Sequence, residues 1–413
     1  MRIIASTQRA AVAALLDRRP RRDPAIERRV AQIVRRVRDG GDAVLRSYAE
    51  RFDRLDGPFE VSREETEAGA ARVPRGVRSA IAIAARNIRK VAAAQVPRTR
   101  VVTPVAGVRI EQRVLPLDRV GCYVPGGRYP LPSSLLMTAI PARAAGVPDV
   151  VAVCPRIDDT VMAAAIEAGV TRLFRLGGAH AVAALAYGTE SVPRVDKIVG
   201  PGNAYVAAAK ALVAPDCAID FHAGPSEIVV ISSRGRARGI AADLIAQAEH
   251  DPDARAILIT PSRRLADAVA RAVEAQLPPD GPARQAIAKN GGIIVSRDID
   301  EAVGLCQRTA PEHVVCDTDA IAARLTRAGT IFVGDFSAQA SGDYATGSNH
   351  VLPTSGAARA RGGLSAADFV RVSSVQRLTR DGLARIAPAA ITLAQAEGLR
   401  AHAASIAVRG ARS

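Results

Sequence analysis

One stretch of the chain, residues 244–253 with the sequence LIAQAEHDPD, combines metal-binding residue types with a helical pattern. Gln247 and His250 are three positions apart, so on a helix they would lie on one face and could bind one ion or one substrate. A histidine near the end of a helix more commonly interacts with the helix dipole, and this role needs no ligand. The stretch alone therefore leaves both a binding role and a structural role open.

A second polar cluster lies in residues 334–354, where no apolar periodicity indicates a helix or a strand. A run of this length without secondary structure is typical of a functional or mobile loop. Asp343 in this run, with Gln247, His250 and one further histidine, would supply nitrogen and oxygen ligands suited to a divalent ion such as zinc. The spacing is too wide for a local motif, so the residues alone indicate a metalloenzyme only as one alternative.

An acid and a histidine stand together at Glu312 and His313, directly before an apolar, strand-like run. A carboxylate and an imidazole at the edge of a sheet could transfer protons and activate water. A solvated surface turn would carry the same two residues without any chemistry. These two residues by themselves leave both interpretations open.

Two glycine-rich loops follow predicted strands. The first, YVPGG, begins at Tyr123, whose ring could stack on a ligand, and the second, GPGNAY, brings Asn203 to the start of a helix of small residues. Backbone N–H groups at a helix start can bind a phosphate or a carboxylate. The dinucleotide pattern GxGxxG is incomplete because Tyr205 occupies its third glycine position, and a plain tight turn explains the loop as well. Two such loops at strand ends nevertheless favour a nucleotide crevice.

The composition excludes several classes of protein. The 413 residues include 48% hydrophobic and 3% aromatic residues, which is ordinary for a globular protein with aliphatic cores. Five cysteines without a CxxC pair predict neither a disulfide framework nor a cysteine zinc site. No apolar run approaches the length of a membrane span, and the N-terminus lacks the apolar core of a signal peptide. We therefore expect a soluble cytoplasmic protein without membrane contact.

The formal net charge of +15 comes almost entirely from arginine. Such a charge could attract nucleic acid or another polyanion. The arginines are scattered, however, with their densest cluster at residues 18–22, and no aromatic residues alternate with them as in single-strand-binding proteins. A solvated basic surface is the preferred interpretation, so we expect no nucleic-acid partner.

The elements that must position these residues alternate between strand and helix patterns over much of the chain. Two successive sets of this alternation predict βαβ units, parallel sheets and two Rossmann-like α/β domains. Asp23 and Pro24 predict the start of an N-terminal helix that ends at Gly40 and Gly41, and residues 101–123 predict a hairpin with its turn near Gly107. The last fifty residues predict amphipathic helices that pack on another domain or subunit.

Several long motifs in one order give the sequence a specific resemblance. They run from Val30 to Arg409 and read VGCYVPGG, GGA followed by ALAYGT, VGPGNAYV, AGPSE, AQAEHDPD, APEH, GDYATGSNHVLPTSG and AEGLRAHA. With these motifs the sequence closely resembles the histidinol dehydrogenase family. The resemblance implies a zinc-dependent enzyme that oxidises L-histidinol to L-histidine through L-histidinaldehyde with two NAD, in the last steps of histidine biosynthesis.

The resemblance also implies an arrangement of the chain, which we expect as a domain-swapped homodimer with shared active sites. Residues 1–20 would form an N-terminal helical arm. Residues 21–121 and 227–362 would form the first α/β domain with the catalytic pair and most zinc ligands. Residues 122–226 would form the second α/β domain with the NAD contacts, and the C-terminal helical tail at 363–413 would contribute to the partner's site.

The family's functional residues carry over onto matching positions here. The implied zinc ligands are Gln247, His250, Asp343 and His402, the last from the partner subunit. In the implied catalytic pair, His313 takes the alcohol proton and Glu312 activates the water that attacks the bound aldehyde. The implied substrate contacts are Ser226, Gln247, His250, His313, Asp343, His350, Glu397 and His402, and the implied cofactor contacts are Tyr123, His180 and Asn203.

Two positions depart from the family pattern. His180 stands where the family usually has glutamine at a cofactor contact, and His222 replaces an expected apolar residue beside the AGPSE motif. The first departure leaves cofactor affinity open, and the second leaves substrate choice open. A related dehydrogenase acting on another small polar alcohol, such as a sulfopropanediol, is the alternative function, and a basic polyanion-binding protein with a vestigial ligand set is the alternative from another class.

Overall fold

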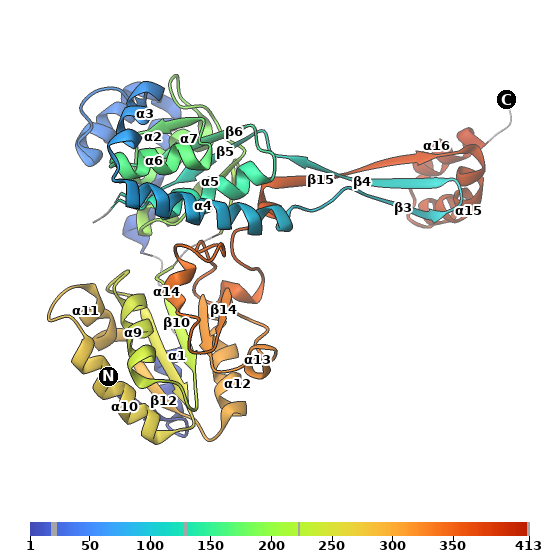
Figure 1. The fold of residues 1–413 in the computed structure, drawn as a ribbon. Helices are drawn as coiled ribbons and strands as arrows, with labels where there is room; N and C mark the ends of the chain where they lie inside the picture. The colour runs from blue at the N-terminus through green and yellow to red at the C-terminus, as the bar shows by residue number, and fades with distance from the viewer. Residues whose placement is uncertain (18–22, 127–129, 222–223, 411–413) are drawn as a thin grey trace.

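The chain folds into two α/β domains and a long arm (Figure 1). The structure, a computed structural model, describes residues 1–17, 23–126, 130–221 and 224–410. His222 and the arginine-rich cluster at 18–22 lie outside these ranges. Within the described residues, no helix combines the length and apolarity needed to cross a membrane.

We call the lower body in Figure 1 the split domain, because its sheet is built from both ends of the first 333 residues. Six parallel strands have the order β1-β12-β11-β10-β13-β14. Their bounds are β1 Arg2–Ala5, β10 Glu227–Ile231, β11 Arg255–Thr260, β12 Gly292–Val295, β13 His313–Cys316 and β14 Thr330–Val333. Several strands are nearly continuous apolar runs, as expected for a parallel sheet covered on both faces.

Helices cover both faces of this sheet. One apolar core joins it to α1 (Arg9–Leu16), α12 (Ile299–Thr309) and α13 (Asp319–Ala322). The other joins it to α9 (Ala237–Ala248), α10 (Arg263–Gln276) and α11 (Pro282–Asn290). The short helix α14 (Gln339–Gly342) contacts α9 at the edge nearest the upper body.

The upper body, which we call the central domain, has a sheet in the order β2-β7-β6-β5-β8-β9. Only β2 runs antiparallel to its neighbour. The strands are β2 Glu60–Val61, β5 Arg119–Tyr123, β6 Asp149–Val153, β7 Arg172–Phe174, β8 Lys197–Val199 and β9 Ala218–Ile219. One face packs on α3 (Arg63–Arg72), α4 (Arg75–Gln95), α5 (Pro132–Ala144) and α6 (Asp159–Ala168), and the other on α2 (Pro24–Tyr48), α7 (Gly178–Tyr187) and α8 (Ala204–Val213).

The two sheets share one strand order. In the central domain β5, β6 and β7 step outward in one direction and β8 returns to the other side of β5, and in the split domain β10, β11, β12 and β13 repeat this order, with β1 added at the edge beyond β12. The switch point lies between β5 and β8 in the central domain and between β10 and β13 in the split domain. A crevice at the carboxyl ends of the strands at such a point is where doubly wound folds bind dinucleotides.

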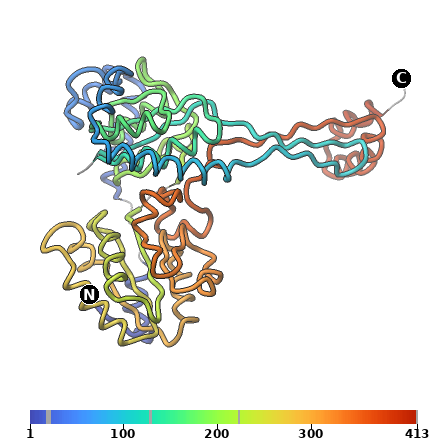
Figure 2. Tube along the Cα trace, viewed as in Figure 1, coloured from blue at the N-terminus to red at the C-terminus, as the bar shows by residue number. Residues whose placement is uncertain are grey.

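The third part is an arm that extends from the central domain (Figures 1 and 2). It consists of an antiparallel sheet of β3 (Arg100–Val105), β4 (Val108–Pro116) and β15 (Val370–Leu378). The hairpin turn at Gly107 has a φ of 85°, which glycine adopts without strain. The arm carries α15 (Arg380–Ala396) and α16 (Arg400–Gly410) at its tip, far from either body.

The two α/β domains and the hairpin are as predicted, but the division of the chain differs. Residues 1–20 were expected as a helical arm, whereas β1 is an edge strand of the split-domain sheet and α1 packs on that sheet. Residues 21–121 were expected to join 227–362, whereas α2, α3 and α4 cover the central sheet, because a parallel sheet needs an apolar layer on each face. The tail expected at 363–413 begins later in the structure, since Leu364 and Phe369 belong to the central core and the chain enters the arm only at β15.

A charged cluster fixes the amino ends of the central strands. Asp149 at the start of β6 accepts hydrogen bonds from Arg119 and Thr171, and Arg172 at the start of β7 pairs with Glu60 at 2.6 Å. Burial alone would raise the pKa of Asp149, but the hydrogen bonds from Thr171 and Arg119 outweigh it and hold this pKa below its ordinary value. The ionised carboxylate therefore stabilises the folded domain.

The variant Asp149→Asn is expected to unfold about 1 kcal/mol more easily at neutral pH, a value discounted for partial exposure. The lowered pKa gives stability that is present above the ordinary value near 3.8 and is lost as the pH falls through the folded value. The difference in unfolding free energy between the variant and the wild type should therefore become smaller in acid. Urea unfolding at neutral pH and near pH 3 measures it, with the exposed loop variant Asp280→Asn as control. A difference that persists in acid would contradict the electrostatic origin.

Candidate active site

The predicted catalytic pair lies at the amino-terminal edge of the split-domain sheet. His313 is the first residue of β13, it pairs in register with Ile228 of β10, and Glu312 directly precedes it. Both side chains are buried, with exposed fractions of 5% for Glu312 and 3% for His313. The surface-turn interpretation of these two residues is therefore wrong. The pair lies at the amino ends of the strands, and the crevice at their carboxyl ends lies at the opposite edge of the sheet.

The backbone of one residue, Glu227, holds both members of the pair. Its N–H donates to Glu312 Oε2 at 2.8 Å, and its carbonyl accepts from His313 Nδ1 at 3.4 Å. A carbonyl oxygen can only accept, so this bond places the proton on Nδ1 and leaves Nε2 as the basic nitrogen. The Glu227 carboxylate is itself held by Arg255 at 3.1 Å and by the N–H of Ser355 at 2.9 Å.

Burial sets the protonation of the pair. Burial raises the pKa of Glu312 well above its ordinary value, and the neighbouring charges of Glu227 and Asp343 raise it further. Burial lowers the pKa of His313 to about 4, although Asp343 opposes the shift. His313 is thus a neutral imidazole at neutral pH and can accept a proton, while Glu312 has the raised pKa that acid–base catalysis requires.

Three of the four predicted metal ligands belong to elements around this pair. Gln247 is buried in the last turn of α9, and Asp343 caps the C-terminus of α14 and accepts from Gln339 Nε2 at 3.1 Å. His250 lies near enough to influence the pKa of His313 electrostatically. The expectation that Gln247 and His250 share one helix face is wrong, because α9 ends at Ala248 and His250 is exposed beyond its C-terminal cap.

The residues around the pair offer suitable donors for a metal ion. The Oε1 atoms of Gln247 and Gln339 are buried and have no hydrogen-bond partner, so each is an acceptor without a donor. Amide oxygen, imidazole nitrogen and carboxylate oxygen together suit zinc. In the described part of one chain, no three His, Cys, Asp or Glu side chains gather closely enough to hold a metal.

The remaining predicted substrate contacts divide into two groups. Ser226 directly precedes β10, and His350 donates from Nδ1 to the Asp343 carbonyl at 2.9 Å with its Nε2 3.4 Å from Ser134 Oγ. Glu397 caps α15 and His402 lies on α16, both exposed at the tip of the arm. Ser226 therefore lies beside the split-domain sheet, and His350 lies against α5 of the central domain. The helices α15 and α16, which carry Glu397 and His402, lie far from both domains (Figure 1).

The predicted cofactor residues lie at the carboxyl edge of the central sheet. Tyr123 ends β5 and is buried, and its hydroxyl accepts from the Gly178 N–H at 3.0 Å. His180 is 2% exposed and donates to Asp53 Oδ2 at 2.7 Å. Asn203 is exposed and caps α8 through its Oδ1. In this conformation Tyr123 and His180 are both buried and hydrogen-bonded within the protein, so Asn203 alone of the three is exposed.

Sequence reasoning missed three residues that the structure places beside the candidate side chains. Glu227 lies within the quoted motif AGPSE, so its adjacency to Ser226 was an available signal. Gln339 stands in the loop that was expected to lack secondary structure, yet it begins α14. Asp53, the partner of His180, is 127 positions away from it and carries no signal in the sequence.

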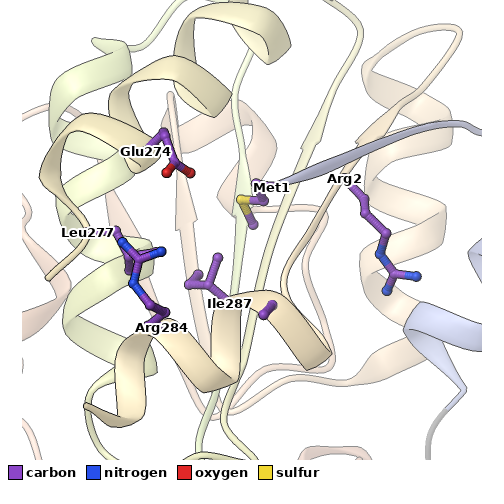
Figure 3. A pocket seen from close by; sticks show the side chains of 7 residues that line it. Met1, Arg2, Glu274, Leu277, Arg284 and Ile287 are labelled. Atoms are coloured by element: carbon purple, nitrogen blue, oxygen red, sulfur yellow. The ribbon is translucent and has the colours of Figure 1, made fainter. Parts of the chain in front are cut away.

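A separate open pocket of about 380 Å³ lies on the split domain beside β1 (Figure 3). Its lining residues are Met1, Arg2, Glu274, Leu277, Arg284, Ile287 and Ala288. None of the predicted site residues lines it. The pocket is therefore distinct from the candidate active site.

Comparisons with known proteins agree over almost the whole chain. A family model described as histidinol dehydrogenase matches residues 16–410. The histidinol dehydrogenase of Methanothermobacter thermautotrophicus is 46% identical over 389 residues, covering 91% of each chain. That of Syntrophotalea carbinolica is 45% identical over 414 residues, covering 97% of this chain and 96% of the relative. A crystal structure of histidinol dehydrogenase from Elizabethkingia anophelis superposes with a TM-score of 0.94 at 32% identity, over 99% of this chain and 98% of that one. This chain belongs to the histidinol dehydrogenase family.

Proposed function

We propose that this protein oxidises L-histidinol to L-histidine through L-histidinaldehyde, with two NAD and a zinc ion, as the last steps of L-histidine biosynthesis. Family membership supports the reaction. The observation that carries the proposal is the buried Glu312–His313 pair, held through the backbone of Glu227. We further propose that it works in the cytoplasm, without contact to membranes or nucleic acid.

His313 is the base for both oxidations. Its Nδ1 donates to the Glu227 carbonyl, so its Nε2 accepts the proton of the substrate hydroxyl as the hydride leaves the carbinol carbon. NAD, when bound, accepts that hydride. The Glu227 carbonyl remains bonded to Nδ1–H and stabilises the imidazolium that forms, which holds the ring in one orientation through both oxidations.

Glu312 serves the step between the two oxidations. Its buried carboxyl has a raised pKa, and the anion takes a proton from a water molecule as that water attacks the aldehyde carbon. The resulting hydrate is again an alcohol with a hydrogen on the reacting carbon. It therefore meets the same base, His313, and loses a second hydride.

Gln247, His250 and Asp343, with His402 from a second copy of the chain, would hold the zinc ion. The ion, when bound, orients the substrate and stabilises developing negative charge. The unpartnered Oε1 of Gln247 and the carboxylate of Asp343 support this assignment on the side of one chain. Ser226 and His350 would bind the substrate from the same chain, and Glu397 from the second copy.

The arm supports a domain-swapped homodimer. It exposes large apolar side chains along its strands and at its tip, among them Val101, Val102, Val372, Leu378, Leu393, Leu399 and Val408. Exposed apolar groups in such number favour a protein partner. A second copy of the chain that receives this arm would gain His402 and Glu397, which its own fold keeps distant.

The central domain would bind NAD at the switch point between β5 and β8. Doubly wound folds bind dinucleotides there, and the loop that brings exposed Asn203 to the start of α8 follows β8. Tyr123 and His180 would then act by shaping the neighbouring loops, since Tyr123 holds Gly178 and His180 is held by Asp53.

An assay with purified protein, zinc, NAD and L-histidinol tests the proposal. The expected result is two NADH and one histidine for each histidinol consumed. A sulfopropanediol offered in place of histidinol tests the alternative substrate, and faster oxidation of it would favour that function. Absence of NADH from zinc-loaded protein with either alcohol would contradict both.

A further inference from the structure

A single glycine at the proposed cofactor loop has both of its backbone polar groups bound by buried charged side chains. Gly200 directly follows β8, and its N–H donates to Asp220 Oδ2 at 2.8 Å while its carbonyl accepts from Lys210 Nζ at 2.9 Å. Its φ of 117° is open to glycine alone, and a Cβ would lie 2.2 Å from the Tyr123 carbonyl. These contacts therefore fix the backbone conformation at the start of the loop 200–203.

The two charged partners are among the most deeply buried ionic groups of the central domain. Lys210 on α8 is 3% exposed, Asp220 after β9 is 4% exposed, and the two form a direct ion pair. Asp220 also accepts from the N–H of Phe221 at 2.6 Å. Apolar residues of the same volume are often at least as stabilising as a buried ion pair, so stability alone does not account for charges at this position.

The position of the pair indicates what it serves. Lys210 on α8 bonds to Gly200, which lies four positions before the start of that helix, and Asp220 bonds to the same residue from directly after the neighbouring strand β9. The loop between Gly200 and the start of α8 contains Asn203, which is the exposed member of the proposed cofactor contacts. Tyr123, another proposed cofactor residue, provides the backbone carbonyl against which Gly200 packs.

We propose that Lys210 and Asp220 are positioning residues for NAD, which act by fixing the loop 200–203 at the switch point between β5 and β8. This inference rests on the proposed function, because it assigns the loop to the cofactor. Neither side chain has exposed surface to offer a ligand, so both act through Gly200 and, beyond it, Asn203.

The test is the double variant Lys210→Met/Asp220→Asn in the full-length zinc enzyme. It removes both buried charges together, so neither is left unpaired, and it preserves side-chain size. Loss of the charge-assisted bonds to Gly200 should weaken NAD binding about tenfold or more by calorimetry. The KM for NAD should rise in parallel, while kcat at saturating NAD and the KM for histidinol stay close to wild type. Hydrogen exchange of the ligand-free protein should be faster in peptides covering 198–206.

The matched control is Arg172→Met. It breaks another ion pair of the same sheet, with Glu60, at the opposite end of the strands. This variant should bind NAD as the wild type does, with unchanged exchange at 198–206. Equal weakening of NAD binding in both variants would overturn the inference, because general loss of stability would then explain it.

A folded double variant with wild-type NAD affinity and wild-type exchange would also overturn the inference, and the proposed function would stand. A wild-type protein that binds no NAD would overturn the proposed function and the inference with it. If the double variant does not fold, Lys210→Gln/Asp220→Asn decides by the same measurements, since it also removes both charges together, and with them the charge-assisted bonds to Gly200, but keeps polar side chains at both positions.

Discussion

The variant Glu312→Gln is expected to release one NADH per site and then slow by about 10²–10⁴-fold, the contribution of one acid–base group. The first oxidation needs only His313 as base, and that residue keeps its bond to the Glu227 carbonyl. The carboxamide can still accept from the Glu227 N–H, so the local fold is retained. It cannot take a proton from water, and the aldehyde is therefore not hydrated.

Single-turnover measurement of NADH against titrated sites tests this expectation. The wild type should release two NADH per site, whereas Glu312→Gln should release one. The control Glu60→Gln changes an acid of the central domain that pairs with Arg172 and should also release two. Two NADH per site from Glu312→Gln at the wild-type rate would show that Glu312 is not the group that activates water.

Two inactive variants, His313→Ala and His402→Ala, are expected to restore activity when their subunits are mixed. His402 is exposed at the tip of the arm, whereas His313 is buried in the split domain, so one chain does not bring them together. In a heterodimer with exchanged arms, one of the two sites has both histidines and the other has neither. Random mixing in equal amounts should therefore give about a quarter of the wild-type activity.

The mixing experiment needs proof of subunit exchange, which two tags of different affinity provide. His402→Ala mixed with wild type is a control for exchange without complementation. Zinc content should not change on mixing, because His313→Ala homodimers keep all four proposed ligands at both sites, His402→Ala homodimers lack the fourth ligand at both, and the heterodimer has it at one of two. Proven heterodimers without activity would contradict a shared site.

The positions of strands along the chain and the hairpin could be predicted from local patterns, whereas the pairing of distant strands and the division into domains could not. Continuous apolar runs such as that of β11 and the turn at Gly107 are local signals, and both were interpreted correctly. The pairing of β1 with β12 and the packing of α2 on the central sheet join residues far apart in the chain. The hydrophobic periodicity of an amphipathic helix does not indicate which of two similar sheets the helix covers.

The candidate site shows the same limit at the level of side chains. Glu312 and His313 could be identified as candidate chemistry from their types, but their burial depends on strand β13 lying next to β10. The bond from His180 to Asp53 and the bond from Gly178 to Tyr123 could not be predicted, because each depends on the tertiary fold. Residue type indicated the chemistry, and packing determined which groups remain available for it.

The edge strand β1 has a consequence for synthesis of the chain on the ribosome. Arg2 pairs with Gly292, and all strands of the central sheet lie between them in the sequence. At roughly 5–20 residues per second, the first strand and the apolar face of α1 emerge tens of seconds before their partners. During that interval the central domain acquires most of its sheet while the N-terminal segment stays unpaired. The nascent chain is therefore expected to need chaperone protection at its first sixteen residues until β12 has emerged.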